Sequence, residues 1–76
     1  MKVLSREELL KKYDDIGPFR EGLAWARKGG KCFHIHPNGT PVYKERYDNV
    51  GSFQKGLALV RKGSSGFYIR PDGTRA

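Results

Sequence analysis

The sequence has little that could cross-link or anchor a fold. Cys32 is its only cysteine, so an internal disulfide is excluded. Only 37% of its 76 residues are hydrophobic, which favours a thin sheet over a thick core. It contains no apolar run long enough for a signal peptide or a membrane span, so we expect a soluble, cytoplasmic chain without a membrane partner. Phosphate-binding loops, zinc-finger spacings and dinucleotide fingerprints are also missing, which argues against an enzyme or a bound cofactor.

The sequence does contain one segment that occurs twice, with a period of 34 residues. Tyr13–Val42 and Tyr47–Ala76 align without a gap and are identical at 15 of 30 positions. A fixed period of this size is typical of repeat architectures. We therefore predict an N-terminal cap over residues 1–12, a first repeat over 13–46 and an incomplete second repeat over 47–76.

The segment before the repeats has the pattern of a short capping helix. Ser5 and Glu8 are spaced as a capping box, in which each side chain accepts a hydrogen bond from the other residue's backbone amide. This spacing predicts a helix over about Arg6–Lys12. Because such a helix is too short to be stable alone, we expect Leu9, Leu10 and Tyr13 to dock on the repeats.

Glycine and proline divide each repeat into short strands, so we predict a mainly β fold of tandem antiparallel hairpins. The predicted strands are Leu23–Arg27, Lys31–His36 and Thr40–Tyr43 in the first copy, and Leu57–Arg61 and Gly66–Arg70 in the second. Side chains alternate along a strand, so Phe33, Ile35, Phe67 and Ile69 are predicted core residues. The Pro-Asn-Gly and Pro-Asp-Gly turns predict a positive φ at Gly39 and Gly73.

The repeated pattern resembles the WG β-hairpin repeat family of bacteria. The resemblance rests on Phe-x-x-Gly-Leu-Ala, a turn, Phe-x-Ile-x-Pro-Asx-Gly and a Tyr-Asp pair, and covers about Tyr13–Ala76. At the place of the family's Trp-Gly pair the chain has Lys31-Cys32 and Ser65-Gly66, so it diverges there. The resemblance implies hairpin arrays without catalytic residues and with binding or interaction roles.

Two kinds of chemistry are weak candidates. Cys32, His34 and His36 lie on one strand face and are zinc or copper ligand types, but the second copy has Gly66, Tyr68 and Arg70 there. Cys32 with His34 could form a nucleophilic pair only inside a cleft, which nothing in the sequence supplies. The Tyr-Asp pairs are better explained by aspartates that cap loop backbone than by acid/base chemistry.

The net charge of +7 permits an anionic partner. Aromatic residues alternate with cations along both repeats, which would suit single-stranded nucleic acid. The alternative, which we favour, is a non-catalytic module that binds a protein or further repeats. The candidate binding-face residues for either partner are Trp25, Tyr43, Tyr68, Arg27, Arg61 and Arg70.

The predicted sheets also have open edges and two partly apolar faces. Exposed strand edges pair with other chains unless they are blunted. The apolar surface is expected at Trp25, Ala26, Leu59 and Val60. We therefore predict self-association that the substitution Trp25→Lys weakens.

Overall fold

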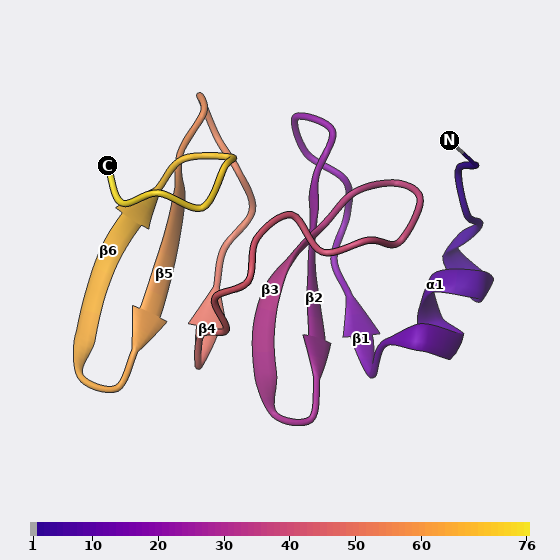
Figure 1. Ribbon diagram of the computed structural model, residues 1–76, viewed down its shortest axis with the longest axis horizontal. Coiled ribbons are helices and arrows are strands. Elements are labelled where there is room, and N and C mark those ends of the chain that lie inside the picture. Colours follow the sequence, from indigo (N-terminus) through magenta and orange to yellow (C-terminus); the bar gives the residue numbers. More distant parts are fainter. Residues whose placement is uncertain (1) are drawn as a thin grey trace.

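The computed structural model describes residues 2–76, so Met1 of the predicted cap segment lies outside the described residues. A short helix, α1 (Arg6–Lys12), precedes two antiparallel sheets of three strands each (Figure 1). The strands are β1 (Asp15–Ile16), β2 (Ala24–Lys28), β3 (Lys31–Ile35), β4 (Asn49–Val50), β5 (Ala58–Lys62) and β6 (Ser65–Ile69). The mainly β fold with an N-terminal helix is therefore confirmed.

Helix α1 has the predicted bounds and the predicted cap. The Glu8 amide donates to the Ser5 hydroxyl at 3.2 Å, and the Ser5 amide donates to the Glu8 carboxylate at 3.0 Å. Leu9 and Tyr13 are buried against the first repeat, as expected. Leu10 was expected to dock too, but it is 41% exposed because it lies on the outer side of the helix.

The two repeats follow the same backbone path. Ala24 pairs with Ile35 in the first sheet, and Ala58 pairs with Ile69 in the second, so the strand register repeats after 34 residues. Gly39 and Gly73 have φ values of 87° and 90°, which confirms the predicted left-handed turns.

The position of the third strand was predicted wrongly. Thr40–Tyr43 forms no strand; it contributes a single bridge between Pro41 and Ile35. Proline lacks the N–H that a continued ladder needs. The third strand of each sheet is instead β1 or β4, which directly follows the Tyr-Asp pair and pairs with β2 or β5.

A backbone pair joins the two sheets. The Cys32 amide donates to the Tyr47 carbonyl at 2.7 Å, and the Tyr47 amide donates to the Cys32 carbonyl at 2.9 Å. The outer edge of β3 therefore continues into the segment that begins the second repeat.

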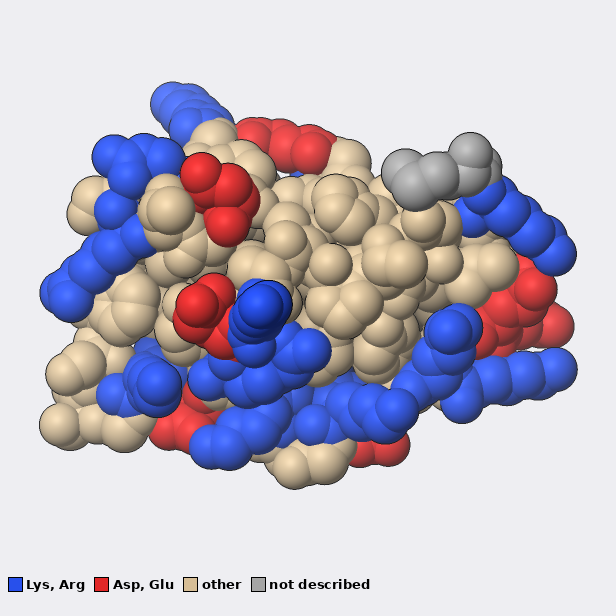
Figure 2. All heavy atoms as spheres, viewed as in Figure 1, with Lys and Arg blue, Asp and Glu red and all other residues tan. Residues whose placement is uncertain are grey.

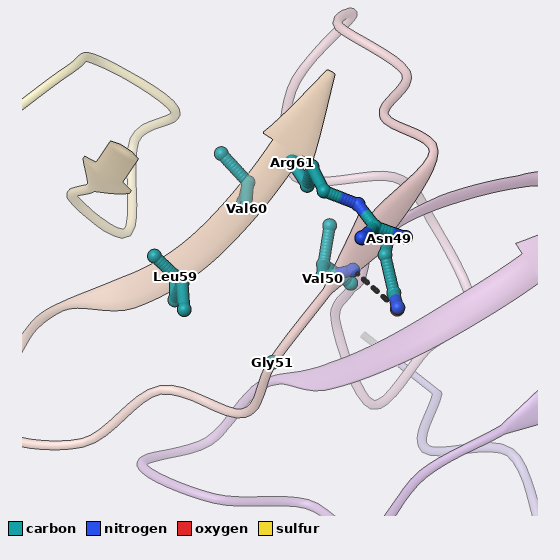
Figure 3. A pocket seen from close by; sticks show the side chains of 6 residues that line it. All are labelled: Asn49, Val50, Gly51, Leu59, Val60 and Arg61. Carbon is teal, nitrogen blue, oxygen red and sulfur yellow. Dashed lines mark hydrogen bonds between the residues drawn. The ribbon is translucent and has the colours of Figure 1, made fainter. Parts of the chain in front are cut away.

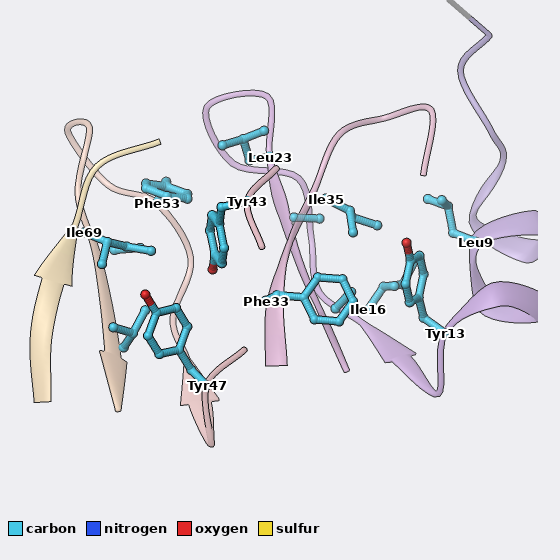
Figure 4. Packing of buried hydrophobic residues seen from close by; sticks show 14 residues of the cluster. Leu9, Tyr13, Ile16, Leu23, Phe33, Ile35, Tyr43, Tyr47, Phe53 and Ile69 are labelled. Carbon is cyan, nitrogen blue, oxygen red and sulfur yellow. The ribbon is translucent and has the colours of Figure 1, made fainter. Parts of the chain in front are cut away.

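The buried side chains form one row that runs from the helix through both sheets (Figure 4). Phe33, Ile35 and Ile69 belong to this core, as predicted. Phe67 does not, since it is only partly buried and packs against the core from outside. The second sheet lacks the neighbour that would complete its enclosure.

Helix α1 and the connector between the repeats occupy equivalent places. The helix segment packs on the Gly39 turn of the first repeat, and the connector packs on the Gly73 turn of the second. A Cβ placed on Gly39 would lie 2.9 Å from Leu4, in the segment that leads into α1. A Cβ on the equivalent Gly73 would lie 2.6 Å from the Cβ of Tyr43 in the connector. The helix thus closes the N-terminal end of the row, as a preceding repeat would.

Candidate functional site

His34 on β3 marks the junction between the two repeats. Its side chain is fully buried, and its two ring nitrogens lie 2.6 Å from the Tyr43 hydroxyl (Nδ1) and 2.8 Å from the Gly51 carbonyl (Nε2). A carbonyl can only accept, so Nε2 carries the proton and Nδ1 accepts from Tyr43. Burial lowers the pKa of His34 and raises that of Tyr43, which keeps both groups neutral.

The second repeat covers this face of the first with the segment Gly51–Gly56. Phe53 is 1% exposed, and its ring centroid lies 4.4 Å from that of His34. The Glu21 carboxylate accepts hydrogen bonds from the Lys55 amide and, at 2.8 Å, from the Gly56 amide. The repeat junction therefore combines a backbone pair, an aromatic contact and a carboxylate cap.

The equivalent face of the second repeat is open. His34 corresponds to Tyr68, which is 53% exposed, and Leu23 corresponds to Leu57, which is 37% exposed. Leu59, which pairs across the sheet with Tyr68, is 51% exposed. We call Leu57, Leu59 and Tyr68 the open face. They line a shallow groove together with Gly51, Ser52, Gln54 and Lys55.

A second groove beside the open face results from one difference between the repeats. In the first repeat the Trp25 indole lies on Gly17 so closely that a Cβ added there would be 2.0 Å from Nε1. Leu59 replaces Trp25 in the second repeat, and a Cβ on Gly51 would meet only the Leu59 carbonyl, at 3.7 Å. The space left by the smaller side chain is a groove lined by Asn49, Val50, Gly51, Leu59, Val60 and Arg61 (Figure 3).

The predicted binding-face residues are not one surface. Tyr68 lies on the open face, and Arg61 lines the adjoining groove. Tyr43 is buried at 8% exposure, and Trp25 is half-buried on Gly17, so neither offers a free ring.

The two remaining binding-face candidates, Arg27 and Arg70, make contacts within the chain itself. Arg27 forms an ion pair with Asp15 at 3.6 Å, and Arg70 donates to the Arg75 carbonyl at 2.7 Å. Leu57, which the prediction omitted, completes the surface. The Gly-Leu-Ala motif could have indicated it, since it places a leucine at the same position of both repeats.

Two of the three proposed metal ligands, Cys32 and His34, have other partners. Both ring nitrogens of His34 have partners, and the Cys32 thiol lies 3.8 Å from the Asp48 carbonyl as a donor. Burial raises the pKa of the Cys32 thiol, which disfavours the thiolate that a metal or a nucleophile needs. Among residues 2–76, no group of three or more His, Cys, Asp or Glu side chains is placed to hold a metal ion.

The aspartates of the two Tyr-Asp pairs cap the hairpin turns. Asp14 accepts from the Gly29 amide at 2.9 Å, and Asp48 accepts from the Gly63 amide at 2.7 Å. The interpretation that these aspartates stabilise loop backbone is confirmed.

Lysine and arginine side chains gather along the edge at which the two hairpin turns lie (Figures 1 and 2). We call this the basic edge; it includes Arg27, Lys28, Lys31, Arg61 and Lys62 at the ends of β2, β3 and β5. Asp48 partly neutralises it, since Lys31 contacts this carboxylate at 2.7 Å. The basic edge adjoins the open face at Arg61, which lines the same groove as Leu59.

The sequence model of one protein family matches the chain. Its description is WG containing repeat, and it matches residues 6–32 and 35–64. The chain therefore belongs to this family of repeat modules. Comparison with curated proteins found no match, and comparison with solved structures found none either. Within the described part of the chain, no helix is both long and apolar enough to span a membrane.

Proposed function

We propose that this WG-repeat chain is a non-catalytic module that binds a protein partner through the open face. The observation that carries the proposal is the exposure of Leu57, Leu59 and Tyr68, at 37%, 51% and 53%. Among their counterparts in the first repeat, His34 contacts Phe53 and Gly51 of the second repeat, Leu23 is buried, and Trp25 is half-buried on Gly17. Apolar side chains gathered on one face favour a protein partner over a small polar ligand.

The proposal includes weak self-association through the same face, because a second copy is always available as a partner. Trp25, the residue first expected to mediate it, is half-buried, so the contact is assigned to Leu59 and Tyr68 instead. The net charge of +7 opposes association, and salt screens that repulsion.

Nuclear magnetic resonance of the labelled chain tests this function. We expect amide shifts at Leu57, Leu59 and Tyr68 to change on dilution from millimolar to micromolar concentration in about 150 mM salt. The substitution Tyr68→Lys should remove the change, whereas Leu10→Lys, on the exposed side of α1, should leave it intact. Shifts that stay constant in the wild-type chain, or that change equally in both variants, would contradict self-association through the open face.

Binding of single-stranded nucleic acid is the second candidate, and the basic edge favours it. Contacts to phosphates release counterions, so such binding weakens steeply as salt rises. The same labelled sample, titrated with a single-stranded oligonucleotide, should then show shifts at Arg27, Lys28 and Lys62 rather than at Tyr68. Absence of those shifts at low salt would eliminate this function.

A further inference from the structure

We infer that the open face recognises an extended protein segment that pairs with the outer edge of β6, inserts an aromatic side chain over Tyr68 and places a carboxylate beside Lys55. The inference rests on the proposed function and names the chemistry of the partner. The junction between the two repeats is the template, because each position on the open face has a counterpart there 34 residues earlier.

The first element of the template is the backbone pair. Cys32 exchanges two hydrogen bonds with Tyr47 at the outer edge of β3. Gly66 has the same register as Cys32, since it pairs with Arg61 as Cys32 pairs with Arg27. Gly66 therefore presents its N–H and C=O on the exposed edge of β6, where an extended segment can add as a strand.

The second element is an aromatic side chain six residues after the paired residue. In the template, Tyr47 pairs with the edge, and Phe53 packs on His34. On the open face the ring under the incoming aromatic belongs to Tyr68. The Tyr68 hydroxyl can donate to a partner carbonyl, as His34 Nε2 donates to that of Gly51.

The third element is the charge of one side chain. The residue at this position is negative at the junction between the repeats and positive on the open face. Glu21 contacts the Lys55 and Gly56 amides of the covering segment. Its counterpart on the open face is Lys55, which would lie against the partner residue two positions after the aromatic. The Lys55 ammonium cannot accept hydrogen bonds from backbone amides as the Glu21 carboxylate does, but it attracts a carboxylate on the incoming segment, so an acidic residue at this position is favoured over a lysine.

The first repeat contains a segment with the required pattern. Phe19 follows Tyr13 by six residues, and Glu21 follows Phe19 by two. A second copy cannot present this segment, because the Tyr13 amide donates to the Leu9 carbonyl of α1 and the Tyr13 ring is buried. The occupant in this proposal is a segment of another protein with this chemistry, and a peptide of residues 13–22 is a suitable probe.

The test measures binding of two labelled peptides to the full chain by fluorescence anisotropy. One has the sequence of residues 13–22, and the other carries Glu21→Lys within it. Because an exposed ion pair is worth little, we expect the first to bind roughly two- to five-fold more tightly. The protein variant Lys55→Glu should reverse that preference. Replacing the peptide's Phe19 by alanine should weaken binding by about tenfold or more.

Two controls make the result decisive. Tyr68→Ala should weaken both peptides without changing their ratio, and a thermal melt should show Lys55→Glu folded as the wild type. Equal affinities of the two peptides for both proteins would overturn the inference. So would peptide-induced amide shifts of the chain at Arg27, Lys28 and Lys62 rather than at Tyr68, or a peptide affinity no higher than the affinity of the chain for a second copy, since a second copy would then be the occupant.

This experiment can fail separately from the proposed function. If no peptide binds while dilution still changes the shifts of Leu59 and Tyr68, the open face is an interaction surface but the segment chemistry is wrong. If both measurements fail, the proposed function fails with the inference.

Discussion

The two repeats have half their aligned residues in common, yet equivalent positions have opposite environments. Phe53 is 1% exposed and Phe19 is 40% exposed; His34 is fully buried and Tyr68 is 53% exposed. The difference arises from what lies next along the row. Phe53 packs on His34 of the first repeat, whereas the element that precedes the repeat of Phe19 in the structure is helix α1. In a repeat array, burial of a side chain is a property of the junction as much as of the residue.

Truncating the two equivalent phenylalanines should give the largest contrast. Phe53→Ala removes a fully buried ring from the junction, so we expect it to cost about 3–5 kcal/mol of unfolding free energy. Phe19→Ala removes a ring that is already 40% exposed and should cost less than about 1 kcal/mol. Urea unfolding followed by circular dichroism measures both. Equal losses would mean that the two repeats are enclosed alike.

The glycines beneath Trp25 and Leu59 sharpen the comparison. Gly17→Ala would place a methyl group 2.0 Å from the Trp25 indole, so the indole must move, at a cost of about 1–3 kcal/mol. Gly51→Ala meets nothing closer than 3.7 Å and should change stability by less than about 0.5 kcal/mol. Trp25 fluorescence should shift only in the first variant. A harmless Gly17→Ala would show that the indole does not rest on Gly17.

Local sequence signals predicted the local structure well. The capping box defines α1, and the Pro-Asx-Gly turns define the left-handed glycines, because neighbouring residues determine both. The third strand was misplaced because its pairing depends on contacts with a segment that does not follow it directly: β1 pairs with β2 and β4 pairs with β5, whereas Thr40–Tyr43 contributes one bridge to β3.

The candidate surface was harder to predict for the same reason. Tyr43 and Tyr68 look alike as aromatic residues near cations, but Tyr43 lies inside the junction and Tyr68 lies beyond it. Alternation along a strand indicates which side chains share a face. It does not indicate whether another segment covers that face, and this alone separates His34 from Tyr68.

The neutral, buried His34 makes the junction sensitive to acid. Its pKa is lowered in the folded chain by burial, while the unfolded chain has the ordinary value of about 6.5. The unfolded chain therefore binds more protons below that pH. Stability contributed by His34 is complete above about pH 6.5 and decreases as pH falls toward its folded pKa. Melting temperatures measured between pH 7.5 and 5 should show the decrease.

A matched pair of variants assigns this effect. His34→Gln keeps a donor and an acceptor but does not titrate, so its stability should be flat over that pH range, whereas Leu10→Gln, on the exposed side of α1, should retain the wild-type slope. The pKa of Asp48 is lowered chiefly by its hydrogen bond with Lys31, so its contribution is lost only near pH 4 and below. If stability depends on pH in His34→Gln as it does in the wild type, another group causes the acid sensitivity.

The smallest expected effect concerns Glu21 and Lys55, the equivalent positions at which the two repeats differ in the sign of the charge. Glu21 accepts from two backbone amides of the second repeat, both exposed to solvent, so Glu21→Gln should cost less than about 1 kcal/mol. Lys55→Gln changes an exposed side chain and should leave stability unchanged within about 0.3 kcal/mol. Amide exchange of Lys55 and Gly56 gives a sharper readout than a melt: Glu21→Gln should accelerate it, because the charged acceptor is gone. If the Lys55 and Gly56 amides stay protected from exchange in Glu21→Gln, the Glu21 carboxylate does not stabilise the junction. The template would then give no reason to expect a charged contact at Lys55.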